Sequence, residues 1–433
     1  MSTKIDIVVD GFLPQVGTLY FDARGGKQSC AFEYDKAWLG FPGRFDIDPM
    51  LPMGSGLLYA GKAAKAGGSV FFGCFADSEP DGWGKKVVLR DRIKRGLKEQ
   101  PTALDYLLAM HDESRVGAIR FRDQQSGEFL ATSLPGRRTT PALIEIDRLL
   151  KASAAVDANE ETAADLQMLL GNGSPLGGMR PKCTVNDNGR LALAKFPSAT
   201  DERDVVRGEV LALTLAEMAG ITAASGRVVV SAAAKKAVAV IDRFDRETHT
   251  GKPRRLLYQS AHTFISATDQ EYAYTDIVDA IRAKGSQPNA DIEELWRRIA
   301  FNILITNVDD HLHNHGFLHV QDGQWTLSPA FDLNPNPERH REFKTMFSHD
   351  LGADATIENL MTVSNDFGIA LPRAREILAK VIDATDQWET VATDRSIDMS
   401  SKEANLFGDA FEHSEKGAAR EALRETYGTD FKS

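Results

Sequence analysis

The sequence has few cysteines, no excess of positive charge and no long apolar run. Its 433 residues include three cysteines, and this odd number without a close pair favours neither a disulfide framework nor a zinc cluster. The formal net charge of −11 argues against a surface that coats nucleic acid unaided. The longest apolar stretches, such as Val228–Ala234, are far shorter than the ~20 residues of a membrane span. The first apolar run contains Asp6, and no signal-peptide pattern follows it. We therefore expect a cytoplasmic globular protein with no membrane partner.

Hydrophobic patterning divides the chain into β-rich and helical stretches. Over the first ~60 residues short apolar runs alternate with turn residues, which predicts a small antiparallel sheet; two helices and a strand follow before Phe121. A helical segment over 141–170 precedes a hairpin with the turn Asn186–Gly189, because an Asn-Gly pair tolerates positive φ. A helix that ends at Gly220 and two further strands complete this part.

From Asp291 onward the pattern is mainly helical. Apolar residues keep the i, i+3, i+4, i+7 spacing from Ile292 to Leu304. Asp291 and Glu294 resemble a capping box, which predicts that the helix begins there. A hairpin with Asp322 and Gly323 in its turn is expected soon after this helix.

The polar segment 306–318 carries the clearest chemical pattern. Asp309 and Asn314 are five residues apart, the spacing of the catalytic Asp and Asn in protein kinases. In that chemistry the carboxylate orients the attacking hydroxyl and accepts its proton, and the amide oxygen binds magnesium. A hairpin returns its ends to within about 5 Å of each other, so we expect Asp332 beside Asn314 as a second magnesium ligand.

Features suited to phosphate binding lie upstream. The stretch Gly171–Gly178 precedes a strand, and its glycines allow backbone N–H groups to approach phosphates. Lys195 ends an apolar strand, and fourteen residues later Glu209 interrupts the apolar face of a helix. Because a buried unpaired carboxylate is costly, we expect Lys195 and Glu209 to pair and to position nucleotide phosphates.

Each feature also has a simpler explanation. A Gly-rich stretch is typical of a flexible loop, and Lys195 and Glu209 could each reach water from the end of a strand or the face of a helix. Asp309 could cap the preceding helix, and Asp332 could begin a turn. The order of these features along the chain matches that of a kinase, which favours the kinase interpretation.

Three alternating histidines suggest a zinc or iron site as an alternative. Residues His311, His313 and His315 would share one face if the segment were a strand. No cysteine or glutamate ligand is near them in sequence, and magnesium bound by the aspartate and asparagine residues already explains the segment. We therefore expect His311 to orient the loop by hydrogen bonds.

Together these motifs resemble the HipA family of bacterial toxin kinases. The matching segments are Ser174–Lys182, Lys195–Pro197, Asp242–Arg246, Asn307–Asn314 and Ala330–Asp332, with Phe75–Trp83 and Arg115–Ala118 in the amino-terminal part. The resemblance implies an α+β protein: a bilobal protein-kinase-like fold with an amino-terminal β/α subdomain and a mainly helical C-lobe. The expected boundaries are 1–130 for the amino-terminal subdomain, 141–250 for the nucleotide-binding lobe and 255–433 for the helical catalytic lobe.

The resemblance further implies a serine/threonine protein kinase that uses ATP and Mg²⁺. Asp309 would be the catalytic base, Lys195 and Glu209 the catalytic ion pair, and Asn314 and Asp332 the metal ligands. The other residues expected to bind the nucleotide are Gly177, Gly178, Lys182, Asp242, Phe244 and His311, with 240–244 as the hinge that holds adenine. Ser174 stands at the family's regulatory serine, whose autophosphorylation adds about −2 charge and expels the loop.

Partners are implied as well. Members of the family are neutralised by a small DNA-binding antitoxin, HipB, and known members phosphorylate aminoacyl-tRNA synthetases. We expect a HipB-like antitoxin, a protein substrate of that kind whose modification arrests growth, and DNA only indirectly through the antitoxin. The alternatives are a kinase of small molecules or lipids and a catalytically silent corepressor. Asn307 stands where aminoglycoside phosphotransferases place a histidine, which disfavours the first, and the intact set of catalytic residues disfavours the second.

Overall fold

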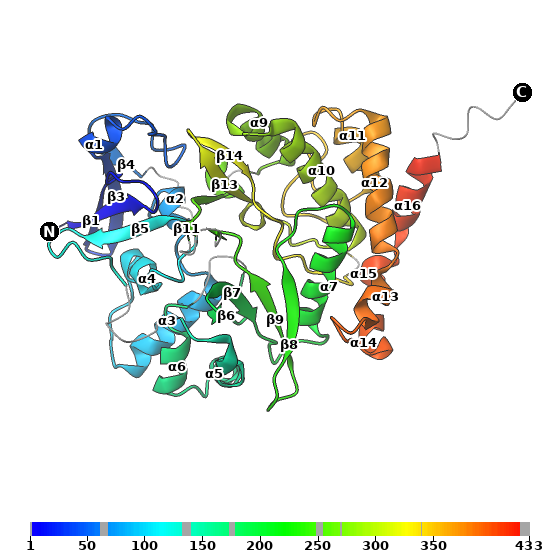
Figure 1. Cartoon of the computed structure of the whole chain (residues 1–433), viewed down its shortest axis with the longest axis horizontal. Helices are drawn as coiled ribbons and strands as arrows, with labels where there is room; N and C mark the ends of the chain where they lie inside the picture. The colour runs from blue at the N-terminus through cyan, green and yellow to red at the C-terminus, as the bar shows by residue number, and fades with distance from the viewer. Residues whose placement is uncertain are drawn as a thin grey trace, which may run out of the picture.

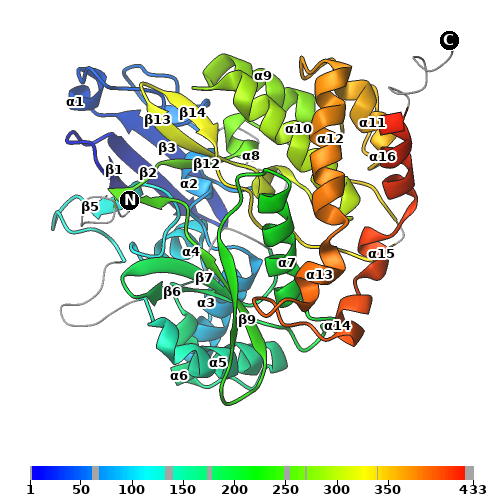
Figure 2. The same cartoon turned by 45° about the vertical axis from the view of Figure 1, so that its right-hand side comes forward.

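A computed structural model describes residues 2–60, 68–131, 140–172, 178–247, 254–268, 271–338 and 340–424. An amino-terminal sheet, a central sheet and a carboxy-terminal group of helices follow one another across the molecule (Figure 1). The turned view shows the helical group on the side away from the amino-terminal sheet (Figure 2). The chain is therefore a mixed helix and sheet protein with its sheets gathered toward one side.

The amino-terminal sheet has the order β4-β3-β2-β1-β5, and its neighbouring strands are antiparallel. Its strands are β1 (Thr3–Val9), β2 (Gly17–Arg24), β3 (Lys27–Tyr34), β4 (Leu58–Tyr59) and β5 (Ile119–Asp123). The helices of this part are α1 (Lys36–Leu39), α2 (Gly73–Ala76), α3 (Gly82–Lys94) and α4 (Ala103–Ala109). The predicted antiparallel unit is confirmed, and β5 extends it from a later part of the chain.

The central sheet is antiparallel and has the order β6-β7-β9-β8. Its strands are β6 (Lys182–Asp187), β7 (Arg190–Lys195), β8 (Gly226–Val230) and β9 (Ala237–Asp242), and its helices are η2 (Leu143–Glu145), α5 (Ile146–Ala158), α6 (Ala163–Leu169) and α7 (Val205–Met218). The predicted turn joins β6 to β7, with Asn188 at φ 50° and Gly189 at φ 92°. Both residues are left-handed, as a two-residue hairpin loop requires.

Strand β7 presents alternate side chains to two hydrophobic cores. Ala192 and Ala194 face the core that includes α5 and α6, whereas Leu193 packs in the other core with residues of α7. Because strand side chains alternate with a period of two, Lys195 lies on the same face as Leu193. The alternation therefore directs the lysine toward α7, where Glu209 is found.

The carboxy-terminal part combines a small sheet, β12-β13-β14, with helices. Its strands are β12 (Tyr258–Ser260), β13 (Gly316–Gln321) and β14 (Gln324–Leu327), preceded by the short pair β10 (Arg246–Glu247) and β11 (Arg254–Arg255). Its helices are α8 (Ala261–Phe264), α9 (Tyr274–Lys284), α10 (Pro288–Leu304), η3 (Leu312–Asn314), α11 (Ile357–Val363), α12 (Leu371–Thr385), α13 (Trp388–Thr393), α14 (Ser401–Asn405), α15 (Gly408–Phe411) and α16 (Ser414–Arg424). The predicted β13–β14 hairpin is confirmed, with Asp322 at φ 50° in its turn.

The start of α10 corrects the sequence prediction. The helix begins at Pro288, three residues before the predicted capping box, and Gln287 is its N-cap. Proline is well suited to the first helical position because its fixed φ is helical and its missing N–H would have no partner there. Asp291 instead accepts a hydrogen bond from the Thr326 hydroxyl at 3.0 Å, and Glu294 forms an ion pair with Arg298.

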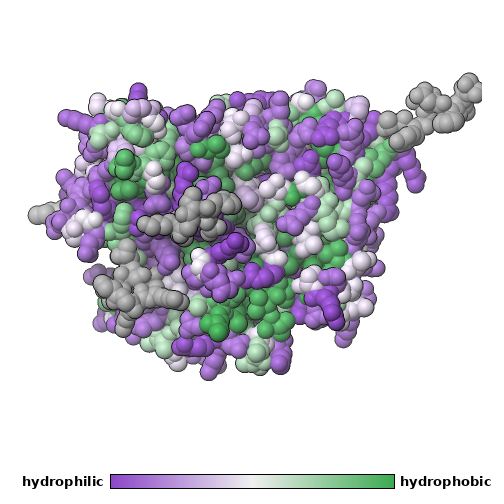
Figure 3. All heavy atoms as spheres, viewed as in Figure 1, coloured by the Kyte–Doolittle hydropathy of each residue, from purple (hydrophilic) through white to green (hydrophobic). Residues whose placement is uncertain are grey.

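The three cysteines are buried free thiols in separate elements: Cys30, Cys74 and Cys183. Within the described ranges, the helices are too short or too polar to cross a bilayer. The face shown in Figure 3 is largely hydrophilic, with an apolar area over the lower half of β8 and β9. Val230, at the end of β8, is 47% exposed.

Candidate active site

A buried lysine and two carboxylates form the centre of the site. The Nζ atom of Lys195 donates to Oε1 of Glu209 at 2.5 Å and to Oδ1 of Asp332 at 2.6 Å. Burial lowers the pKa of the lysine, but the carboxylates of Asp332 and Glu209 outweigh burial and raise the pKa overall. The predicted pairing of Lys195 with Glu209 is present, and the ammonium stays charged.

Asp332 is held in an unusual backbone conformation. Its φ is 56°, in the left-handed region that non-glycine residues seldom adopt and that is enriched at functional sites. The side-chain amide of Asn334 donates to its carbonyl oxygen at 3.1 Å and to Oδ1 at 3.3 Å. Burial raises the pKa of the carboxyl, but the ammonium groups of Lys195 and Lys182 lower it further than burial raises it. Asp332 is therefore ionised.

Lys182, predicted to bind the nucleotide, contacts the amino-terminal part of the chain. Its Nζ donates to Oδ2 of Asp81 at 2.5 Å and to the carbonyl of Gly178 at 2.8 Å. The other carboxylate oxygen of Asp81 accepts from the Gly84 amide at 2.8 Å and so caps α3. Burial lowers the pKa of Lys182, and the charge of Asp81 opposes this effect.

Asp81 is a residue of the site that the sequence prediction missed. Its place before Gly82-Trp83 fits a helix N-cap, but nothing local indicates an ion pair with Lys182, which is 101 residues away in the sequence.

The loop after α10 is anchored by Asp310 and presents Asp309 to solvent. The buried carboxylate of Asp310 accepts hydrogen bonds from the Tyr274 hydroxyl at 2.5 Å and the Asn302 amide at 2.9 Å, and Nε2 of His315 lies 2.9 Å away. Asp309 is exposed. The neighbouring acids therefore differ: one fixes the loop, and the other is free to meet a second molecule.

Asn314 carries a buried oxygen without a partner. Its Nδ2 donates to the Asp309 carbonyl at 3.0 Å, but Oδ1 has no hydrogen-bond partner in the described part of the chain, and the residue is 8% exposed. Buried acceptors are normally satisfied, so an orphaned one requires an explanation such as an ion. Hard divalent cations prefer oxygen ligands, and the oxygens of Asn314 and Asp332 fit this requirement.

The two predicted metal ligands come from segments that the structure joins. At the base of the β13–β14 hairpin, the backbone N–H of Ser328 donates to the Gly316 carbonyl at 2.8 Å. The backbone N–H of Asn334 donates to Oδ1 of Asn307 at 3.3 Å. The segment after Asp332 is thus tied to the loop that contains Asn314. A metal ion shared by these two residues stays a prediction.

The three histidines point to different neighbours. Residues 312–314 form a 3-10 turn rather than a strand. His313 stacks on His262 with ring centroids 4.6 Å apart, and His315 lies beside Asp310. Nδ1 of His311 is buried and has no partner among the residues that the structure describes. In that part of the chain no group of three or more histidine, cysteine or acidic residues is arranged to hold a metal.

The predicted adenine hinge borders a narrow cavity. Asp242, Phe244 and Phe331 line a space of about 20 Å³ together with Lys195 and Asp332. The rings of Phe244 and Phe331 are 5.3 Å apart. Adenine binding there stays a prediction. Two further predicted residues, Gly177 and Ser174, lie outside the described residues, whereas Gly178 contributes the carbonyl that Lys182 binds.

A second buried charge cluster joins two motifs that the sequence could not connect. Asp245 accepts hydrogen bonds from Arg243 at 2.7 and 2.6 Å, from Arg246 at 2.6 Å and from the Gly117 amide at 2.7 Å. Both arginines also donate to the carbonyl of Arg115, at 3.3 and 2.7 Å. Gly117 has a φ of 75°, and a Cβ there would lie 3.2 Å from the Tyr258 amide. This cluster fixes the amino-terminal part against residues 243–246.

The site combines a lysine and a glutamate on facing elements of a small antiparallel lobe with an acidic loop from a helical lobe. This arrangement defines a bilobal, protein-kinase-like α+β fold with an additional amino-terminal sheet. The chain belongs to the HipA family: the family model "HipA N-terminal domain" matches residues 6–122, and "HipA-like C-terminal domain" matches residues 174–388.

One solved structure agrees with the fold over most of the chain. The chain is similar to HipA in a complex of the Shewanella oneidensis MR-1 toxin–antitoxin system with HipB and its operator DNA, at 16% identity, a TM-score of 0.67 and 97% coverage of both chains. A weaker likeness, at 13% identity and a TM-score of 0.45, covers 59% of this chain and 95% of the Helicobacter pylori proinflammatory kinase CtkA. The search of curated proteins finds no match. The predicted family and fold class are confirmed.

Proposed function

We propose that the protein is a HipA-type serine/threonine protein kinase that transfers the γ-phosphoryl group of ATP to a cytoplasmic protein and thereby arrests growth. One observation carries this proposal: the Lys195 ammonium, at the end of β7, is held between Glu209 of α7 and Asp332 of a later loop. Such a lysine places a fixed positive charge where a triphosphate would lie, and phosphoryl transfer depends mainly on positioning and electrostatic stabilisation.

Asp309 is the proposed base. The oxygen of the acceptor hydroxyl forms a bond to the γ-phosphorus of ATP, and the bond from that phosphorus to the oxygen shared with the β-phosphate breaks. The hydroxyl proton passes to the Asp309 carboxylate, and ADP leaves. The exposed position of Asp309 supports this role because an acceptor can approach it, while Asp310 holds the loop in place.

Asn314 and Asp332 are the proposed holders of Mg²⁺. The unpartnered Oδ1 of Asn314 and the ionised carboxylate of Asp332 supply the oxygen ligands that this ion prefers. When bound, the ion would offset negative charge on the phosphates. Lys182, Gly178 and His311 are the further proposed contacts of the nucleotide, with Asp242 and Phe244 at the adenine.

The proposed partners follow from the family. The Shewanella HipA was solved with HipB and operator DNA, and we propose a HipB-like antitoxin as the partner of this chain, with DNA met through it. The net charge of −11 supports indirect contact with DNA. An aminoacyl-tRNA synthetase is the first protein substrate to test, and Ser174 is the proposed site of inhibitory autophosphorylation.

The experiment that tests the function compares wild type with Asp309→Gln. Purified proteins are incubated with γ-labelled ATP, Mg²⁺ and a bacterial lysate, and labelled peptides are identified by mass spectrometry. We expect labelled serine or threonine residues in a lysate protein with wild type only. Label found only in small molecules or lipids would favour the alternative kinase class, and no difference between the proteins would refute the proposal.

A further inference from the structure

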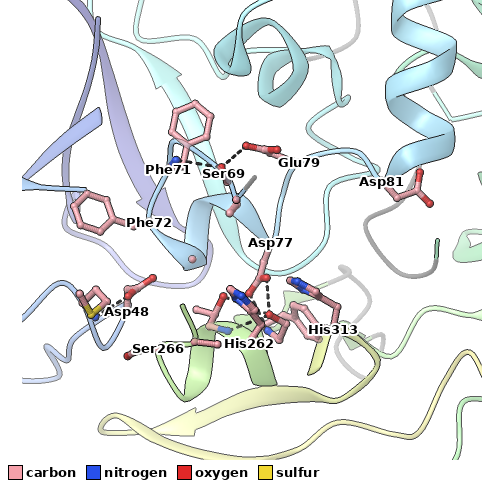
Figure 4. Close-up of a pocket in the computed structure, with 18 of the residues that line it drawn as sticks. Asp48, Ser69, Phe71, Phe72, Asp77, Glu79, Asp81, His262, Ser266 and His313 are labelled. Carbon is pink, nitrogen blue, oxygen red and sulfur yellow. Dashed lines mark hydrogen bonds between the residues drawn. The ribbon is translucent and has the colours of Figure 1, made fainter. Parts of the chain in front are cut away.

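A cavity of about 490 Å³ lies between the amino-terminal part of the chain and the loop that contains Asn314 (Figure 4). We call it the loop cavity. Phe71, Phe72 and Ala76 line it from the region around α2, and Ala267 lines it from the segment after α8. Its size falls in the range of a ligand pocket, ~300–1,000 Å³, and greatly exceeds the narrow space at the hinge.

The carboxylates in the wall of the loop cavity are already bound to the protein. Asp48 accepts from the Cys74 and Met50 amides, both at 2.7 Å. Asp77 accepts from the Ser260 amide at 2.8 Å and from the Ser260 hydroxyl at 2.7 Å. The bonds between Asp77 and Ser260 connect the end of α2 to β12, so two segments that line the cavity are joined. Polar residues also line the cavity, but most of the lining surface by area is apolar, which favours an apolar occupant.

Glu79 is likewise engaged, since its carboxylate accepts from the Ser69 hydroxyl at 2.6 Å and from Lys85 at 3.0 Å. Figure 4 shows Ser69 and Glu79 joined by this hydrogen bond, with Asp77, His262 and His313 below them in the view. Glu79 and Asp81 therefore have the cationic partners Lys85 and Lys182, whereas Asp48 and Asp77 are held by hydrogen bonds from neutral groups.

The loop cavity shares a wall with the proposed catalytic loop. Asn314, His311 and His313 line it, and the unpartnered, nine-tenths buried Oδ1 belongs to Asn314. Asp309 lies in the same loop and is joined to Asn314 through its carbonyl. An extended peptide advances ~3.3 Å per residue, so a chain whose hydroxyl meets Asp309 can place a neighbouring side chain in the cavity.

We propose that the loop cavity receives an aromatic or large aliphatic side chain of the protein acceptor, a few residues from the hydroxyl that is phosphorylated. The amino-terminal subdomain, which supplies Phe71, Phe72 and Ala76, would then set acceptor specificity for a reaction performed by the other two lobes. This inference rests on the proposed kinase function and names the class of acceptor: a peptide segment with a hydroxyl residue and a nearby apolar anchor.

The test fills the cavity from two separate segments of its lining. Ala76→Phe and Ala267→Phe each add an aromatic ring, and Ala233→Phe, in the exposed turn between β8 and β9, is the matched control. Each protein is given γ-labelled ATP, Mg²⁺ and Ser/Thr peptide libraries in which one flanking position at a time is varied. ATP hydrolysis without peptide is measured in parallel.

Wild type and Ala233→Phe should prefer an apolar residue over glycine at one fixed position by about tenfold or more, because burying such a side chain yields ~1.5–3 kcal/mol and 1.4 kcal/mol is tenfold. The two filled variants should lose this preference through a higher KM for peptide, while their kcat and their ATP hydrolysis stay within about twofold of wild type. Phe72→Leu enlarges the cavity and should shift the preference toward larger residues. This variant tests the inference if a filled variant fails to fold.

Two results would overturn the inference, and they are distinguishable. If wild type phosphorylates peptides with no apolar preference, or the filled variants keep the wild-type preference, the loop cavity does not bind the acceptor and the kinase function stands. If wild type hydrolyses ATP but transfers phosphate to no peptide or protein, the proposed function itself fails, and the inference fails with it.

Discussion

Two buried charge clusters in this protein differ in how completely their groups are satisfied. In the junction cluster, Asp245 accepts from two arginines and a backbone amide, and Arg243 and Arg246 use further N–H groups on backbone carbonyls. In the open cluster, Lys195 is shared by two carboxylates, and Oδ1 of Asn314, in the loop that is hydrogen-bonded to Asn334, has no partner within the described ranges.

The difference separates charges that stabilise the fold from charges that are available for chemistry. A saturated cluster has no capacity left for a ligand, so its loss should reduce stability. An open cluster with a left-handed aspartate and an orphaned oxygen retains that capacity, so its loss should reduce activity first. Mutations in the junction cluster should therefore reduce stability more than activity, and mutations in the open cluster should reduce activity more than stability.

The largest effect is expected for Asp309→Gln, next to the open cluster. Loss of a general base should lower phosphoryl transfer by about 10²–10⁴-fold. Because the side chain is exposed, the melting temperature should not change. Labelled-ATP transfer and circular dichroism check the two expectations. Asp322→Asn, in an exposed turn of β13–β14, is the matched control and should retain wild-type transfer. A large loss of stability in Asp309→Gln would contradict this expectation and show that Asp309 stabilises the fold.

Asp332→Asn tests the open cluster itself. Asparagine tolerates the left-handed backbone, so the change removes charge without adding strain. Transfer should fall by ~10²-fold or more because charge stabilisation is lost. Lys195 keeps Glu209, and Lys182 keeps Asp81, so the free energy of unfolding should fall by less than it does in Asp245→Asn, where both arginines lose their carboxylate. Urea unfolding measures both variants; a loss in Asp332→Asn as large as that in Asp245→Asn would make this cluster structural.

Asp245→Asn should reduce stability and leave phosphoryl transfer nearly unchanged. It leaves two buried arginines without their carboxylate, and breaking such a pair costs about 3–5 kcal/mol in the free energy of unfolding. Transfer at a temperature where the variant is folded should stay within a few-fold of wild type. Asp242→Asn is the control for stability, since its side chain is 39% exposed and lies 3.5 Å from Arg227, a pair worth less than about 1 kcal/mol.

The smallest effect is the pH dependence of the junction cluster. Burial raises the pKa of Asp245, but Arg243 and Arg246 lower it well below its ordinary value. Its stabilising contribution is thus fully present above the unfolded pKa of about 3.9 and is lost as pH falls toward the folded pKa. The difference in unfolding free energy between wild type and Asp245→Asn should be constant from pH 7 to 5 and shrink below about pH 4. A difference that shrinks already near pH 6 would contradict this assignment.

Much of the fold and part of the site could be predicted from local pattern. The sequence predicts the Asn188-Gly189 and Asp322-Gly323 turns because positive φ restricts the choice of residue. It predicts the Lys195–Glu209 pair because a charge on an apolar face needs a partner. The predicted start of α10 was wrong because the Asp291–Glu294 pattern resembles a capping box, whereas Pro288 occupies the first helical position, which suits proline.

The amino-acid order by itself determined the turns, the amphipathic faces and the types of residue available for phosphoryl chemistry, since these depend on neighbours a few positions apart. Only the tertiary structure decided that Asp81 binds Lys182, that Asp245 binds Gly117, and that a cavity opens between α2 and the loop of Asn314. Those contacts join residues about a hundred or more positions apart. Long-range pairing of this kind leaves no periodic trace in the sequence, because it depends on how whole elements pack.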